Sequence, residues 1–285
     1  MSVGIVTDSS AYLEPGIAQE LNVRVVPFEV TVGQRHFQDG INLDAAGYYE
    51  LVREYDDAVQ VVPPSVQAFF QAYLELSRTT TEILSIHPPE ALTPAIRYAR
   101  EAARMLLGRC QIVVLDSQTI SLGLGILVEH AARAAALNQD FEEIMRLVRG
   151  LIPRVYVVFF SENLEYLKRG GRIGEAQALL GTMLGIKPFL TLEGGTIQPM
   201  EKVRTREEAL EKLVEFVSEF DDLVKLAIIR GMNDRPDEIA MLHERFEGLF
   251  PVLEVPVIYY GPVLAAHIGP DNLGIIVYEA LEFEE

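Results

Sequence analysis

The first half of the chain alternates short apolar runs with segments whose apolar residues recur at helical spacing. The apolar runs cover residues 3–6, 23–30, 81–86 and 110–116, and helical patterns cover 47–55, 65–78 and 93–108. Alternation of strands and helices predicts a parallel sheet with helices on both of its faces. We therefore expect an α/β domain at the start of the chain.

The pattern changes near Pro153. A strand-like run at 155–160 precedes a helical segment, a Gly170–Gly171 turn and a second helical segment. Next come a Gly-Gly hairpin signal at 188–200 and a long amphipathic helix at 205–220. Three more strand-like runs follow at 225–231, 252–260 and 273–283. Hairpins mixed with helices indicate an α+β domain with a mixed sheet. The predicted division is an N-terminal α/β domain, 1–153, and a C-terminal α+β domain, 154–285.

Composition excludes several classes of function. Of the 285 residues, 49% are hydrophobic and 23% charged, which is typical of a folded chain with a sizeable core. A formal net charge of -18 disfavours binding to nucleic acid and to anionic membranes. Cys110 is the only cysteine and the histidines lack zinc-site spacing, so we expect neither a disulfide nor a metal. The N-terminal residues lack the pattern of a signal peptide, and no apolar run reaches about 18 residues. We expect a cytoplasmic protein without stable membrane insertion.

Polar residues follow two of the predicted strands. Asp8-Ser9-Ser10 comes after the first run and Asp116-Ser117 after the fourth, at the sheet edge where ligands usually bind. Capping of a following helix explains both equally well. The G-x-S-x-G, G-x-x-x-x-G-K-[ST] and G-x-G-x-x-G motifs are absent, so no residue is assigned a catalytic role.

Basic residues gather in an otherwise acidic chain. The segment "LKRGGRIG" carries Lys168, Arg169 and Arg172 around two glycines, and "EKVRTREEAL" carries Arg204 and Arg206. Glycines expose backbone N–H groups, and together with cations they suit an anion. Tight turns with solvated basic residues remain the alternative.

Taken together, these motifs resemble the DegV family over essentially the whole chain. The resemblance rests on "GIVTDSSAYL", "VVPFEV", "FQDGINL", "VVLDSQTISLGLGILV", "YLKRGGRIG", "IKPFLTLEGGTI", "EKVRTREEAL" and "HIGP", in this order. It implies the two-domain EDD fold of that family. It also implies a lipid-binding protein, not an enzyme, that holds a long-chain fatty acid such as palmitate and needs no other cofactor. The fatty acid would lie in a tunnel between or within the two domains, and its carboxylate would be presented to a separate fatty-acid kinase catalytic subunit.

The resemblance also implies ligand-binding residues. Val61 stands where the family has a carboxylate-binding threonine, so that hydroxyl is lost, and Thr93 stands at the position of a carboxylate-binding serine. Arg172, Arg204 and His267 occupy the places of the family's basic residues. We add Asp8 and Ser9, because they end the first strand.

Two alternatives stay open. Val61, Glu90 and Pro94 replace polar or flexible family residues, so a diverged member could bind an apolar ligand whose head group is not a carboxylate. The second alternative is a hydrolase or phosphotransferase that acts by itself and uses Asp8 or His267.

Overall fold

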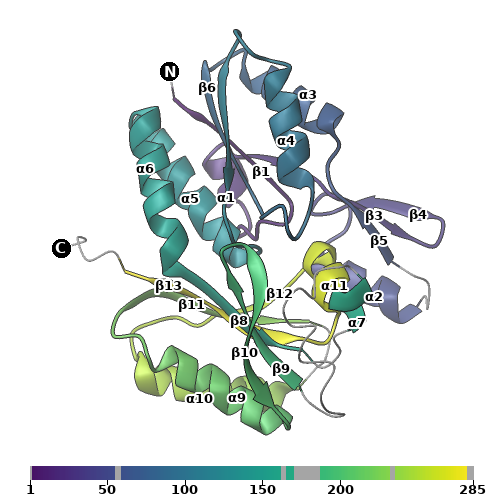
Figure 1. Ribbon diagram of the computed structural model, residues 1–285, viewed down its shortest axis with the longest axis vertical. Helices are drawn as coiled ribbons and strands as arrows, with labels where there is room; N and C mark the ends of the chain where they lie inside the picture. Colours follow the sequence, from purple (N-terminus) through teal and green to yellow (C-terminus); the bar gives the residue numbers. More distant parts are fainter. Residues whose placement is uncertain (1, 55–58, 162–164, 170–186, 232–234, 281–285) are drawn as a thin grey trace. The chain divides into compact units, whose positions relative to one another are not determined.

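The computed structural model describes residues 2–54, 59–161, 165–169, 187–231 and 235–280 (Figure 1). The chain divides into two units. Unit 1 comprises Met1–Pro153 with Gly261–Val263, and unit 2 comprises Arg154–Tyr260 with Leu264–Glu285. The short segment Gly261–Val263 thus groups with unit 1, although its sequence position lies in the second half.

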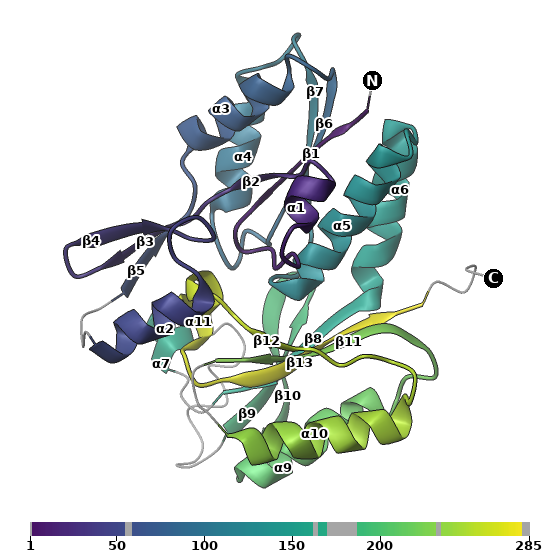
Figure 2. The same cartoon turned by 180° about the vertical axis from the view of Figure 1, so that it is seen from behind.

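Unit 1 is built on a parallel sheet of order β2-β1-β6-β7. Its strands are β1 (Gly4–Asp8), β2 (Arg24–Val26), β6 (Glu82–His87) and β7 (Gln111–Asp116). Helices α3 (Val66–Leu76) and α4 (Ala95–Arg104) cover one face, and α5 (Leu122–Ala136) and α6 (Phe141–Leu151) cover the other (Figures 1 and 2). The predicted parallel sheet with helices on both faces is confirmed.

The apolar run 23–30 is not the single strand that its composition predicts. It divides at Pro27-Phe28 into β2 and β3 (Glu29–Val32), and β3 pairs antiparallel with β4 (Arg35–Gln38) and β5 (Val59–Val62) in a separate sheet. Proline has no N–H to continue a ladder, and the Phe28 side chain enters the core. Helices α1 (Ile17–Glu20) and α2 (Ala45–Glu54) complete unit 1.

The parallel arrangement brings three loops to one edge of the main sheet of unit 1. Strands β1, β6 and β7 run in the same direction, and His87 is the register partner of Asp116. The loops that follow Asp8, His87 and Asp116 therefore leave the sheet at the same edge. Five of the polar residues that the sequence singles out lie at this edge: Asp8, Ser9, Thr93, Asp116 and Ser117.

Unit 2 contains a mixed sheet of order β10-β9-β8-β13-β11-β12, as predicted for this half of the chain. The strands are β8 (Val155–Phe160), β9 (Lys187–Glu193), β10 (Thr196–Val203), β11 (Leu223–Arg230), β12 (Val257–Tyr259) and β13 (Leu273–Glu279). Helices α9 (Arg206–Val217) and α10 (Pro236–Leu249) pack on the sheet through buried residues such as Leu213 and Phe246 (Figure 1).

Short elements complete the described chain: η1 (Ile152–Arg154), α7 (Glu165–Arg169) and α11 (Pro262–Ile268). The sequence did not lead us to expect α10 or α11. Across the described ranges, no helix is both long enough and apolar enough to cross a bilayer.

Candidate functional site

A chain of hydrogen bonds connects buried polar side chains at the carboxyl edge of the parallel sheet. The Asp8 carboxylate lies 2.6 Å from Nδ1 of His87, and Nε2 of the same ring lies 2.6 Å from the Ser85 hydroxyl. The Ser85 hydroxyl in turn lies 2.8 Å from the hydroxyl of Tyr73. All four residues are fully buried. The chain thus links β1, β6 and α3.

The order serine, histidine, aspartate is also that of a hydrolase triad. Here the arrangement lacks access, because Ser85 and His87 face the core from alternate positions of one strand and the His87 ring packs edge-on against Phe69 at 5.0 Å. Burial also raises the pKa of Tyr73, which keeps its hydroxyl protonated. These bonds join the sheet to α3 and leave no path for a substrate to reach the Ser85 oxygen. The sequence did contain a signal for this buried chain of hydrogen bonds. Ser85 and His87 alternate with apolar residues in "EILSIH", but we did not single them out from the sequence.

The second carboxylate oxygen of Asp8 closes a turn. It accepts hydrogen bonds from the Ser10 amide, at 3.0 Å, and from the Ser10 hydroxyl. Ser9 accepts a hydrogen bond from the Phe28 amide at 3.0 Å. The helix-cap alternative for Asp8 was wrong, because the next helix begins only at Ile17.

Asp39 is a second buried acid at this edge of unit 1. Burial raises its pKa to about 7, a hydrogen bond with the Ser9 side chain lowers it, and the nearby Asp8 raises it further. Its partners are a hydroxyl and an amide, which stabilise a carboxylate less than a cation does. Asp39 therefore changes its charge near neutral pH. Sequence reasoning missed it, although it stands inside the quoted motif "FQDGINL".

Thr93 is buried in the loop between β6 and α4. Its hydroxyl accepts a hydrogen bond from the Ala95 amide at 3.4 Å, and the N-cap of α4 is Pro94. Among the described residues the Thr93 hydroxyl donates no hydrogen bond, so its proton is available. Glu90 is exposed and lies 3.9 Å from Arg97 and 3.8 Å from Arg100, so its charge is balanced at the surface.

The other predicted ligand residues are distributed over both units. Val61 is half-buried in β5 and packs against the unit 1 core cluster that contains Phe28. Arg204 and His267 belong to unit 2, where Arg204 is exposed and His267 is buried in α11. Arg172 lies outside the described residues.

Unit 2 buries two arginines, Arg206 and Arg230, whereas the predicted ligand residue Arg204 is exposed. Arg206 donates from Nε to Glu238 at 2.6 Å and lies 4.9 Å above the Phe160 ring, and Arg230 lies 5.2 Å above the Tyr259 ring. Ion pairing and aromatic faces compensate for their desolvation. We expected cations beside the start of α9, but Arg230 at the end of an apolar strand was missed.

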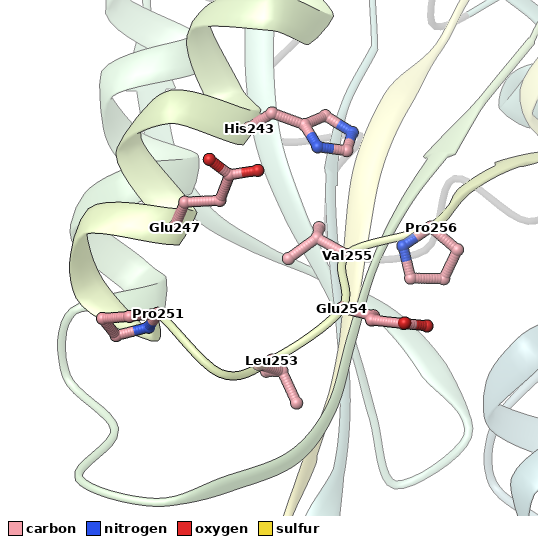
Figure 3. Close-up of a pocket in the computed structure, with 7 residues that line it drawn as sticks. All are labelled: His243, Glu247, Pro251, Leu253, Glu254, Val255 and Pro256. Atoms are coloured by element: carbon pink, nitrogen blue, oxygen red, sulfur yellow. The ribbon is translucent and has the colours of Figure 1, made fainter.

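A groove of about 570 Å³ lies between α10 and the segment before β12 (Figure 3). His243, Glu247 and Glu254 supply its ionisable groups, and its lining contains neither lysine nor arginine. The acidic lining is unsuited to a carboxylate. In the described part of the chain, no cluster of three or more histidine, cysteine or acidic side chains is arranged to hold a metal.

Comparison with known proteins identifies close relatives of this architecture. A sequence model described as an uncharacterised protein of the DegV family matches residues 2–280. A DegV domain-containing protein of Deinococcus radiodurans is 32% identical over 284 residues, covering 96% of this chain and 98% of its own.

Two solved structures are similar over the whole fold. A DegV family protein from Thermus thermophilus, described for its fatty acid binding, is 31% identical, with a TM-score of 0.85 over 98% of this chain and 100% of its own. DegV of Bacillus subtilis, described as a fatty acid binding protein, is 27% identical, with a TM-score of 0.88 over the same shares. The predicted two-domain DegV fold is confirmed, and the chain belongs to the DegV family.

Proposed function

We propose that the chain is a lipid-binding protein, not an enzyme, and that its ligand is a long-chain fatty acid. The observation that carries the proposal is the full-length likeness to two proteins described as binding fatty acids, at 31% and 27% identity. The Ser85–His87–Asp8 arrangement supports the same conclusion, because this array resembles a hydrolase site but is closed to substrate.

The acyl chain supplies most of the binding free energy in this proposal. Burial of a methylene group contributes about 0.8 kcal/mol, so about a dozen contribute roughly 10 kcal/mol before the cost of association. A hydrogen bond to a charged carboxylate adds about 1.5 to 3 kcal/mol. The change to Val61 therefore weakens binding without abolishing it.

Thr93 is the best-supported head-group residue. It is buried, it stands at the start of a helix, and its hydroxyl proton is not donated to any described group. Val61, Asp8, Ser9, Arg172, Arg204 and His267 remain predicted ligand residues. The tunnel, the fatty-acid kinase partner and the cytoplasmic location are likewise parts of the proposal that rest on the sequence.

A second candidate is an apolar ligand with a neutral head group, and the specific observation in its favour is Val61. In this case the tunnel would be retained while selection for a carboxylate is lost.

Lipid extraction tests the proposal. We expect mass spectrometry of the purified protein to recover long-chain fatty acids, and the delipidated protein to take up added palmitate. Recovery of no acyl species, together with no uptake of palmitate, would overturn the proposal. Recovery of a neutral lipid alone would favour the second candidate.

A further inference from the structure

The groove between α10 and the segment before β12 contains carboxylates that the described chain leaves without partners. Glu247 comes from α10 and Glu254 from the segment opposite, and both are exposed (Figure 3). Across the described residues, neither side chain forms an ion pair or a hydrogen bond. Glu238, at the other end of α10, pairs with Arg206 at 2.6 Å. This acidic groove therefore carries negative charge that favours a cationic group.

Apolar side chains stand in solvent beside these carboxylates. Val252 lies between the lining residues Pro251 and Leu253 and is fully exposed, and Leu249 in the last turn of α10 is 41% exposed. A metal ion or a small polyamine would contact the carboxylates and leave this apolar surface uncovered. A protein segment can cover both, because protein interfaces combine apolar contacts with charged ones.

The strand that follows the groove stands at the end of its sheet. β12 pairs in parallel with β11, and in the described part of unit 2 no strand pairs with its other edge. Pro256 and Tyr260 bond toward β11, through the Pro256 carbonyl at 3.0 Å and the Tyr260 amide at 3.1 Å. Since backbone groups alternate in direction along a strand, Val257 and Tyr259 point their N–H and C=O groups away from β11. These groups can pair with an added strand.

The free edge of β12 and the acidic groove belong to one surface. Val257 packs against the core cluster that contains Phe246 of α10. Tyr259, two residues further on, projects to the same face of the sheet and is 48% exposed. Alternate side chains of an added strand would project to this face as well, beside α10 and the groove.

We propose that the acidic groove and the free edge of β12 form a docking surface for an extended basic segment of another protein. The segment adds to the sheet beside β12, places a lysine or arginine near Glu247 and Glu254, and covers Val252 with an apolar side chain. Charge argues against a second copy as the occupant, because the chain carries a net charge of -18 and copies repel one another. The proposal does not depend on the fatty acid, since the surface belongs to unit 2 alone.

Binding of a defined peptide tests the proposal. The probe is a fluorescein-labelled peptide of about eight residues that alternates lysine with valine, because this alternation suits a strand. Fluorescence anisotropy measures its Kd, and we expect Glu247→Gln combined with Glu254→Gln to raise that Kd at least about fivefold. Hydrogen exchange followed by NMR should show slower exchange of the Val257 and Tyr259 amides in the complex. General attraction between opposite charges would not slow these two amides.

Glu29→Gln combined with Glu193→Gln is the matched control, since it removes the same charge from exposed positions elsewhere. We expect its peptide Kd to stay within about twofold of the wild-type value. Equal weakening by the two double variants, unchanged exchange of the Val257 and Tyr259 amides, or no binding of the peptide would overturn the proposal. Self-association of the wild type that is lost in the Glu247→Gln, Glu254→Gln variant would also overturn it, because a second copy would then be the occupant.

Discussion

Unit 1 buries acids, whereas unit 2 buries cations. Asp8 and Asp39 are surrounded by an imidazole, hydroxyls and amides, while Arg206 and Arg230 lie against a carboxylate and aromatic rings. Arginine stays charged at any pH that a folded protein meets, whereas burial raises the pKa of Asp39 in unit 1 to about 7. The sheet edge of unit 1 is therefore the region whose charge state can respond to a ligand or to pH.

The buried bond between Asp8 and His87 should give the largest effect. We expect Asp8→Ala to lower the free energy of unfolding by about 3 to 5 kcal/mol, because His87 and Ser10 lose a buried partner. Urea unfolding measures the loss. Asp116→Ala is the control, since Asp116 also ends a strand of the same sheet, β7, but is only half-buried, and about 1 kcal/mol is expected there. Equal losses would show that Asp8 is an ordinary turn residue.

Asp39 should make stability depend on pH. Its pKa is raised in the folded state to about 7, so its contribution is fully present below the ordinary aspartate pKa and is lost as the pH rises through 7. We expect wild-type stability to fall by about 2 to 3 kcal/mol relative to Asp39→Asn between pH 5 and pH 8. Urea unfolding at several pH values provides the measurement. As a control, the exposed Glu29→Gln variant should show the same dependence of unfolding free energy on pH as the wild type. If the curves of unfolding free energy against pH were parallel for wild type and Asp39→Asn, the raised pKa of Asp39 would be contradicted.

The arginines of unit 2 should show a smaller cost and no such pH dependence. Arg206→Met keeps the aliphatic bulk but removes the pair with the partly solvated Glu238, and we expect a loss of about 2 kcal/mol. The matched control is Arg245→Met. Both side chains of the Arg245–Glu211 ion pair are exposed, so this pair should contribute at most about 0.5 kcal/mol to stability. Thermal unfolding of both variants side by side checks the difference. Similar unfolding midpoints for the two variants would mean that the buried ion pair of Arg206 stabilises the fold no more than an exposed one.

Thr93 should affect binding more than folding. We expect Thr93→Val to raise the palmitate Kd about tenfold, since one hydrogen bond to the carboxylate is lost. Its effect on stability should be small, because the hydroxyl accepts only the long bond from Ala95. A palmitate titration measures the change, with the exposed Thr79→Val as control. An unchanged Kd would leave Thr93 with a purely local role at the start of α4.

The sequence predicts the architecture better than the site. The spacing of apolar residues locates the parallel strands and the hairpin, because each depends on a local pattern. The same spacing wrongly predicts β2 and β3 as one strand, because Pro27 and Phe28 do not interrupt the apolar run. The partners of Asp8 could not be predicted, because His87 and Asp8 are 79 residues apart and meet only through strand order. Burial of Asp39 likewise depends on tertiary packing. The role of Thr93 in ligand binding stays a prediction that rests on the family resemblance.

Comparison of palmitate with hexadecanol tests the central claim most directly. The two ligands share the same apolar chain, so any difference in Kd for the delipidated protein reports the head group. If the chain is a fatty-acid-binding protein, palmitate should bind at least about tenfold more tightly, as one or more charged hydrogen bonds imply. Equal or tighter binding of hexadecanol, or no binding of either ligand, would contradict this account.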